Sequence, residues 1–193
     1  MSGLEIIPPH AVADAIAQER ESREFRPTAM ILAHTVLNPE TGLISFVGIV
    51  SSKNTKQQHE ATMWWLPQGR LDDEIPEVAA LRELREEIKK GIKPVSPEAF
   101  TILGAIRDSS SKPRDGYKAK GKGGKLLIAC SAQVESTGAL KPNRKENIAR
   151  ASWLEASALQ AILAGNMLAN PRKELKARFS IAMIDLVLEK LAK

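Results

Sequence analysis

Residues 66–92, "LPQGRLDDEIPEVAALRELREEIKKGI", combine a turn with a helix that has two unlike faces. Pro76 suits a first helical turn, and the acidic residues just before it favour the positive end of the helix dipole. At about 100° per residue, the apolar side chains gather on one face and the glutamates on another. The stretch therefore predicts a helix over 76–90. The apolar set is Val78, Leu81, Leu84 and Ile88, and the acidic set is Glu83, Glu86 and Glu87.

The acidic face has two interpretations. It is an ordinary solvated face if its charges only form i,i+4 pairs such as Arg82 with Glu86, each worth about 0.2–0.5 kcal/mol. It is a metal site if the carboxylates at i, i+3 and i+4 converge, because hard divalent cations prefer clustered oxygen ligands on a rigid element. A site of the second kind would hold Mg²⁺ against the phosphates of a substrate and activate water.

The spacing of these residues resembles the Nudix box, which reads G, five residues, E, seven residues, R-E, an aliphatic residue, any residue, E-E, any residue, G and an aliphatic residue. This chain departs from the box twice, with four residues between Gly69 and Glu74 and three between Glu87 and Gly91. The second departure predicts a slightly longer helix. The matching residues are Gly69, Glu74, Arg82-Glu83-Leu84, Glu86-Glu87 and Gly91-Ile92.

The resemblance implies a hydrolase that cleaves a pyrophosphate bond in a nucleoside diphosphate linked to another moiety, using Mg²⁺ or Mn²⁺. The sequence "PQG" is similar to the approach to the box in dinucleoside polyphosphate hydrolases and RNA 5′-pyrophosphohydrolases. Dinucleoside polyphosphates and RNA 5′ ends are therefore candidate substrates. The general base stays open between Glu83, Glu87 and the more distant Glu146. By resemblance, the metal ligands are Glu83, Glu86, Glu87 and the Gly69 carbonyl, and the supporting pair is Arg82 with Glu74.

The net charge of +5 is concentrated in residues 107–125, "RDSSSKPRDGYKAKGKGGK". This segment is either a solvated loop or a basic segment that attracts a polyphosphate or RNA electrostatically. Trp64 and Trp65 should point to opposite faces of an extended segment, one into the core and the other free to stack on a base. The candidate substrate-binding residues are Arg70, Trp65, Lys118, Lys120 and Lys122.

The remaining pattern predicts an α/β fold, a Nudix-like α/β/α sandwich with a mixed β-sheet. Apolar β-branched runs around "NPETG" favour a hairpin. We expect one domain over 1–193, with helical additions at about 1–25 and about 170–193. The predicted strands are 28–37, 43–50, 100–108, 125–134 and 148–154, and the other predicted helices are 11–20, 156–165 and 171–193.

Composition limits the remaining classes of function. Cys130 is the only cysteine, so no intrachain disulfide or cysteine metal cluster can form, and it is expected to be a buried strand thiol. No membrane span or secretory signal is visible, which predicts a cytoplasmic protein that binds no membrane. The oligomeric state stays open, with a homodimer as one candidate. The competing function is a non-catalytic Nudix-like module that binds RNA or another polyanion, although such a module gains nothing from clustered acids without a metal.

Overall fold

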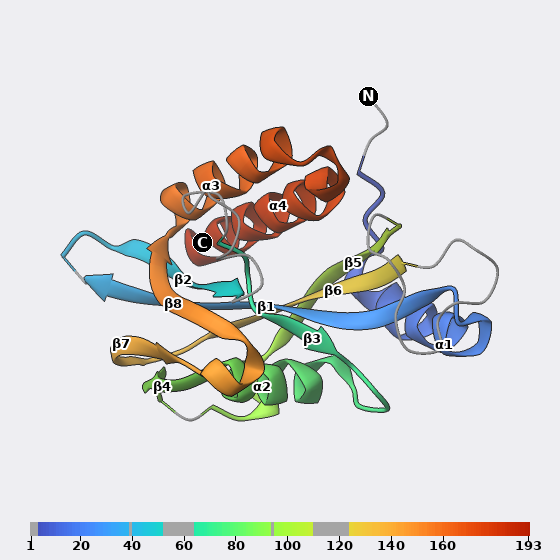
Figure 1. Cartoon of the computed structure of the whole chain (residues 1–193), viewed down its shortest axis with the longest axis horizontal. Coiled ribbons are helices and arrows are strands. Elements are labelled where there is room, and N and C mark those ends of the chain that lie inside the picture. The colour runs from blue at the N-terminus through green and yellow to red at the C-terminus, as the bar shows by residue number, and fades with distance from the viewer. Residues whose placement is uncertain (1–3, 39, 52–63, 94, 110–123) are drawn as a thin grey trace.

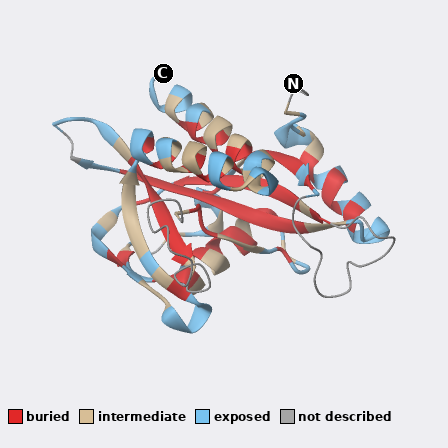
Figure 2. Cartoon of the chain, turned by 45° about the horizontal axis from the view of Figure 1, so that its top comes forward, coloured by how far each residue is buried: buried red, intermediate tan, exposed pale blue. Residues whose placement is uncertain are grey.

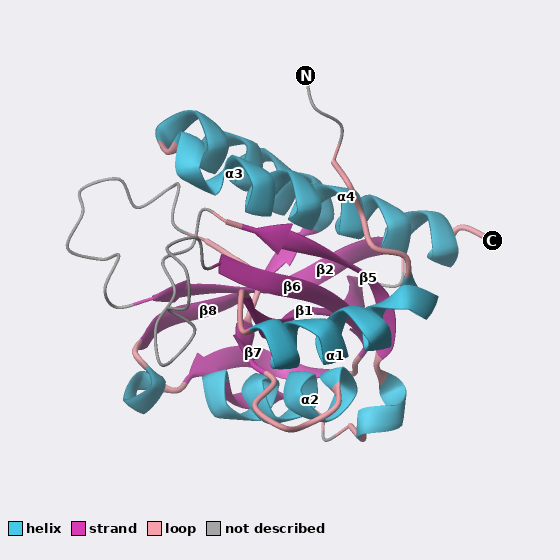
Figure 3. Ribbon diagram, turned by 90° about the vertical axis from the view of Figure 1, so that its right-hand side faces the viewer, coloured by secondary structure: helices cyan, strands magenta, loops and turns pink. Residues whose placement is uncertain are grey.

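A computed structural model describes residues 4–38, 40–51, 64–93, 95–109 and 124–193. A mixed six-stranded sheet forms the middle layer, with α3 and α4 on one face and α1 and α2 on the other (Figures 1 and 3). The predicted α/β/α sandwich is therefore confirmed. The helices are α1 (Val12–Ser22), α2 (Pro76–Glu87), α3 (Ala156–Ala169) and α4 (Glu174–Leu191), with short 3₁₀ turns η1 (Pro9–Ala11), η3 (Pro97–Ala99), η4 (Arg144–Glu146) and η5 (Pro171–Lys173).

The large sheet has the order β5-β6-β1-β2-β8, and β3 also pairs with β1. A second sheet contains β4 and β7, which are antiparallel and lie on the same side as α2 (Figure 1). The strands are β1 (Phe25–Asn38), β2 (Leu43–Ser51), β3 (Gln68–Arg70), β4 (Ile88–Ile92), β5 (Thr101–Asp108), β6 (Gly124–Gln133), β7 (Ser136–Pro142) and β8 (Ile148–Glu155).

The long strand β1 organises the sheet around the site. Its parallel partner β6 occupies one edge from Phe25 to His34. β3 and β2 must therefore share the other edge, and they do so in sequence: Thr28 pairs with Arg70 of β3, while His34 pairs with Phe46 of β2. Farther along β2, Ile49 bridges to Trp65 instead of to β1, and Ile49, Trp65 and Gln68 line a cleft at this edge.

The core lies on both faces of the large sheet, as the buried segments in Figure 2 show. Successive β1 side chains alternate between the two layers, as expected for a strand covered on both sides. Toward α1 and α2 the core contains Ala29, Ile31, Val47, Leu81, Leu84 and Ile128. Toward α3 and α4 it contains Met30, Leu32, Phe46, Leu159, Phe179 and Met183.

The prediction of a helix extending to residue 90 is wrong. α2 ends at Glu87, and Ile88 already has extended backbone angles (φ −119°, ψ 108°). The next residues form β4 and pair with β7, burying Ile88 while the two lysines after it stay exposed. Gly91 has φ +102° inside this strand, and a Cβ there would lie 2.7 Å from the Ala139 carbonyl oxygen. This glycine therefore permits close strand contact and does not end the helix.

Other predicted elements are confirmed. The hairpin of β1 and β2, the strands β5, β6 and β8, and the helices α1, α3 and α4 lie where the pattern placed them, within a few residues. Cys130 is a buried free thiol on β6. β7 was missed because its sequence, "STGALKP", alternates weakly and contains only one buried residue, Leu140. No helix in the described ranges has the length and hydropathy needed to cross a membrane.

Candidate active site

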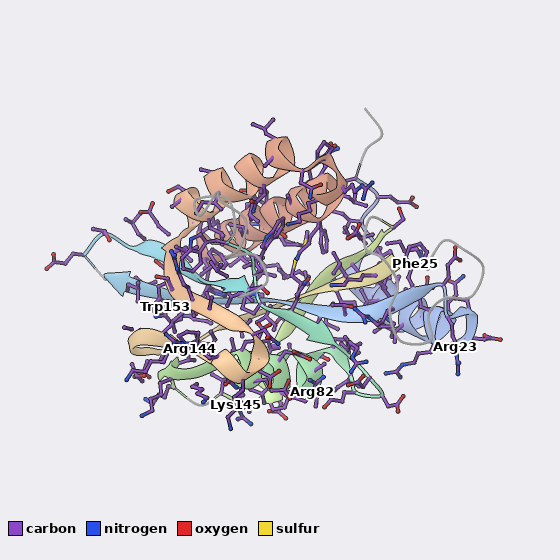
Figure 4. The ribbon with its side chains drawn as sticks, in the orientation of Figure 1. Arg23, Phe25, Arg82, Arg144, Lys145 and Trp153 are labelled. Carbon is purple, nitrogen blue, oxygen red and sulfur yellow. The ribbon has the colours of Figure 1, made fainter. Side chains whose placement is uncertain are left out.

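Arg82 connects α2 to the loop that precedes it, and Figure 4 labels it on this helix. Its Nε donates to Glu74 Oε2 at 2.8 Å, and its Nη2 donates to the Arg70 carbonyl at 2.6 Å. Its Nη1 donates to Glu83 at 2.6 Å and to Glu86 at 3.3 Å. One guanidinium group therefore fixes the loop and also holds two of the glutamates that the sequence singled out.

A second arginine reaches the same loop from α1. Arg20 Nη2 donates to the Asp72 carbonyl at 3.1 Å and to the Glu74 carbonyl at 2.9 Å. Asp72 has a left-handed backbone, with φ 48°. The neighbouring Glu19 is buried and accepts from Arg107 Nε of β5 at 2.6 Å, which anchors α1 to the sheet. The loop of 70–75 is thus braced from both α1 and α2.

Gly69 and Glu83 fit each other closely. A Cβ placed on Gly69 would overlap the Glu83 carboxylate, so only glycine leaves room for this side chain. Burial raises the pKa of Glu83, while the hydrogen bond from Arg82 lowers it. The backbone of β3 at Gly69 therefore lies directly against the partly desolvated Glu83 carboxylate. This proximity is required if the Gly69 carbonyl and Glu83 are to bind the same cation.

Glu87 is the most enclosed of the helix glutamates, at 8% exposure. Its Oε2 is buried and has no hydrogen-bond partner in the described part of the chain. Burial, with a further contribution from Glu83, raises the pKa of Glu87 to about 8, although a hydrogen bond from the Gln68 backbone opposes this shift. An orphaned carboxylate oxygen of this kind is costly unless something binds it.

The donor set fits a hard divalent cation in chemistry, because it combines carboxylates with a backbone carbonyl. The unpartnered Oε2 of Glu87 and the glycine beneath Glu83 both support that fit. No three acidic, histidine or cysteine side chains in the described ranges already form a metal site, however. Arg82 pairs with one oxygen each of Glu83 and Glu86, so their other oxygens are the ones that a cation would use if the guanidinium group stays in place.

Glu87 faces a cleft of about 510 Å³. Glu146 lines it too, from η4, which is joined to the end of α2 by a hydrogen bond from Asn143 N to the Glu87 carbonyl at 2.8 Å. We call Glu146 and the α2 glutamates, which reach the cleft at Glu87, its acidic side. The buried Asp108 of β5 also lines the cleft, where its backbone pairs with that of Lys125 on β6. The cations that line the same cleft form its basic side: Lys125, Arg172, Lys173 and Lys176.

The basic side is built against Trp65. The ammonium groups of Lys173 and Lys176 lie 5.1 and 4.4 Å from the centre of its ring, at cation–π distance. Burial lowers the pKa of Lys176 to about 7, and repulsion from Lys125 and Lys173 adds to this effect. Trp65 itself is buried and pairs through its backbone with Ile49 of β2.

The cleft brings together only part of the predicted set. Glu87, Glu146 and Trp65 line it, whereas Arg70 is exposed outside it, with its Nε 3.6 Å from Asp72. Lys118, Lys120 and Lys122 lie outside the described residues. Trp64 is partly buried beside Gly48.

Sequence reasoning missed three of the cleft cations, Arg172, Lys173 and Lys176, whereas Lys125 belongs to the basic segment of 107–125. A signal was available in "PRKELKAR", residues 171–178, where Lys173 and Lys176 are three residues apart and therefore share a helix face. That signal looks like an ordinary amphipathic helix start, because the tryptophan that it meets is about a hundred residues away in the sequence.

Comparisons with known structures agree with this architecture. A NUDIX hydrolase from Alicyclobacillus acidocaldarius superposes with a TM-score of 0.51 and 12% identity, covering 73% of this chain and 83% of that one. A C. elegans Ap4A hydrolase has a TM-score of 0.46 and 18% identity, covering 82% of this chain and 98% of that one. The NUDIX domain of Shewanella oneidensis NrtR, solved with ADP ribose, has a TM-score of 0.47 and 22% identity, covering 77% of this chain and 88% of that one. A comparison with curated protein sequences gives no match.

The family comparison covers most of the chain. The model of the NUDIX domain matches residues 32–179, from the middle of β1 into α4. This range contains the box, both sides of the cleft and every strand of the large sheet at least in part. Because the match spans well over half of the sequence, this chain belongs to the Nudix family.

Proposed function

We propose that this chain is a metal-dependent pyrophosphohydrolase that cleaves an anhydride bond in a nucleoside diphosphate linked to another moiety. One observation carries the proposal: the same cleft is lined by a buried Glu87, whose Oε2 has no hydrogen-bond partner in the described ranges, and by a set of lysines and an arginine. A pyrophosphate chain is long and anionic, so it complements such a cleft when a cation balances the acidic side. Dinucleoside polyphosphates and RNA 5′ ends are the candidate substrates.

The acidic side would do the chemistry. Glu83, Glu86, Glu87 and the Gly69 carbonyl would hold Mg²⁺ or Mn²⁺, which when bound offsets phosphate charge and lowers the pKa of water. The ion pair of Arg82 Nε with Glu74 Oε2, at 2.8 Å, holds the loop against the helix.

Glu146 is a third candidate base beside Glu83 and Glu87, because it lines the cleft from a separate turn. Its carboxylate is exposed and has no hydrogen bond or ion pair within the described ranges, so it is free to accept a proton from water. The basic side has a different part in the reaction. Its cations bind phosphates of the chain beyond the reacting bond and so contribute to the affinity for the substrate.

Hydrolysis assays test this proposal. The wild-type chain is incubated with nucleotide sugars, dinucleoside polyphosphates, triphosphorylated RNA and inositol pyrophosphates, with Mg²⁺, with Mn²⁺ and with excess chelator. We expect hydrolysis of at least one class that stops in chelator and in the Glu83→Gln/Glu87→Gln variant. Glu98→Gln, an exposed site on η3, is the matched control and should keep full activity.

The assays also decide against the competing function. A non-catalytic module that binds RNA would retain RNA in a filter-binding assay while none of the substrate classes is hydrolysed. Hydrolysis that persists in excess chelator would refute the metal-dependent mechanism. The proposed organisation is one domain over 1–193, in which the helical segments at about 1–25 and about 170–193 contribute Arg20 and the α4 lysines to the site.

A further inference from the structure

The pair of lysines on Trp65 is an unusual arrangement of charge. Lys173 and Lys176 are three residues apart at the start of α4, so they share one face, and like charges at this spacing repel. Both ammonium groups are nevertheless directed to the same indole ring, at 5.1 and 4.4 Å. Neither makes an ion pair within 4.0 Å with any carboxylate of the described residues. The ring attraction, together with the longer-range attraction of Lys176 to Asp108 and Glu87, holds two partly desolvated cations together at the cleft wall.

Burying charge without a partner is costly, so such a pair calls for an anion. Lys125 and Arg172 line the same cleft and add to its positive potential. The acidic side has the opposite requirement, since it accepts a cation and, through it, the phosphates that react. A group of two phosphates carries less charge than a longer chain, so it pairs with fewer of these cations. A chain of three or more phosphates supplies charge along the whole basic side, with or without a cation at the acidic side.

We propose that Lys173 and Lys176, positioned by Trp65, form a specificity-determining subsite that favours linear chains of three or more phosphates over diphosphate-linked substrates. This inference rests on the proposed function only in placing the substrate in this cleft. The subsite recognises the non-reacting end of the chain, so its contribution is to binding and selectivity.

Trp65 is a positioning residue in this scheme. The two ammonium groups occupy a position over its ring, so that ring face is not free to stack on a base. Trp65 is buried in the core layer that faces α3 and α4, and its backbone pairs with Ile49, so the indole is held in place. The lysines are therefore held toward the cleft and lose little further side-chain entropy when an anion binds.

The experiment measures binding without hydrolysis. Inorganic tripolyphosphate and inorganic pyrophosphate are titrated into the full chain in excess chelator by calorimetry at two ionic strengths. We expect the wild type to bind tripolyphosphate at least about tenfold more tightly than pyrophosphate, with a steeper salt dependence because more charge is neutralised. Lys173→Met/Lys176→Met should remove this preference. Lys190→Met/Lys193→Met, with the same change of charge at the other end of the α4 segment, should keep it.

Methionine keeps the apolar stem of lysine and removes a desolvated charge, so the melting temperature of the double variant should be unchanged or higher. A Lys173→Arg/Lys176→Arg variant keeps both charges and should retain the preference, which separates loss of charge from loss of fold. Trp65→Phe, with a weaker cation–π surface, should lose part of the preference while the pyrophosphate affinity stays constant.

Three results would overturn the subsite: equal affinity of the wild type for the two anions, an unchanged preference in the methionine double variant, or an equal loss in the Lys190/Lys193 control. The assay does not depend on catalysis. If no substrate is hydrolysed but the preference is present and specific to these lysines, the subsite stands and the hydrolase proposal fails. If hydrolysis occurs and the preference is absent, the subsite fails alone.

Discussion

The acidic and basic sides of the cleft are built in different ways. The helix glutamates lie within five residues of one another on α2, and Arg82 already compensates two of them. The basic side takes its cations from β6, η5 and α4, and two of them, Lys173 and Lys176, lie over a tryptophan that precedes β3. No carboxylate in the described ranges lies within ion-pair distance of these two lysines, and Asp108 and Glu87 attract Lys176 only at longer range. The helix glutamates thus have a direct ion-pair partner in the protein, whereas the lysine pair has none.

This difference separates two tasks. A carboxylate that can exchange an arginine for a metal ion has a low-cost resting state and a second state for chemistry. A pair of desolvated ammonium groups has no such alternative partner, so it gains most when the substrate arrives. We therefore expect changes on the acidic side to alter turnover and changes on the basic side to alter affinity and selectivity.

The largest effect is expected for Glu87→Gln. Removing this charge eliminates one principal ligand of the cation, so kcat for the best substrate should fall by about a hundredfold or more. Steady-state kinetics at saturating Mg²⁺ measures this. In the same assay Lys173→Met/Lys176→Met should raise KM and leave kcat within about threefold, as expected for lost uniform binding. The comparison fails if the two variants show the same split between kcat and KM.

Gly69→Ala tests how closely the acidic side is fitted. The new methyl group overlaps the Glu83 carboxylate and must displace it, so kcat should fall about tenfold to a hundredfold and unfolding free energy by about 1–3 kcal/mol. Denaturant melts of Gly69→Ala, Glu83→Ala and the double variant provide the control. The double variant should regain stability relative to Gly69→Ala, because the clash is gone. Strictly additive losses would contradict the close fit.

Arg20→Ala should have a smaller effect on the same side. It removes two hydrogen bonds from α1 to the loop carbonyls of Asp72 and Glu74, at an exposed position. We expect kcat to fall about threefold to tenfold, the size of one net hydrogen bond, with KM almost unchanged. Glu21→Ala, an exposed neighbour on α1, should have wild-type kinetics. Equal effects of the two substitutions would remove Arg20 from the site.

The pH dependence of stability should have opposite signs on the two sides in metal-free protein. Glu87, which interacts with Glu83, Glu146 and Lys176, has its pKa raised from 4.5 to about 8. The folded chain then binds more protons than the unfolded chain between these values, and stability falls as pH rises. Glu87→Gln should remove that slope and stabilise the protein at pH 8 by about 1–3 kcal/mol in thermal or denaturant melts.

Lys176 should make stability depend on pH in the opposite direction. Its pKa, lowered from 10.5 to about 7, makes the unfolded chain bind more protons between these values, so stability rises with pH there. Lys125, Lys173, Asp108 and Glu87 are the charges that act on it. Lys176→Met should flatten the profile above pH 7 and leave the Glu87 window in place. The same slope changes in both variants would show that the two groups titrate as one unit.

The two sides also differ in how far the sequence could predict them. The box residues lie close together in the chain, so local sequence predicted the helix start at Pro76, and the resemblance to the Nudix box implied the Arg82–Glu74 pair. The close fit between Gly69 and Glu83 was not predicted. The helix end was missed because Ile88 and Lys89 suit a helix locally, and only pairing with β7 draws them into a strand. The partner strand lies about fifty residues away.

The basic side was predicted least well for the same reason. Trp65 was expected to be free to stack on a base or to lie in the core, and its real neighbours are the lysines of α4. Local periodicity says which residues share a face of α4 but not which distant ring that face meets. The basic segment of 107–125 drew attention instead, and of its lysines only Lys125 is within the described residues and lines the cleft.

The placement of β3 has a consequence for hydrogen exchange. β1 is held by β6 along ten of its residues and by β2 beyond, whereas β3 has three residues and pairs with β1 alone among the described strands. Amide protons of β1 should therefore exchange only when the whole domain opens, and those of Gln68 to Arg70 through much smaller local openings. The peptide that carries the Gly69 carbonyl thus belongs to the quickly opening part of the molecule, although it lies directly beside the slowest.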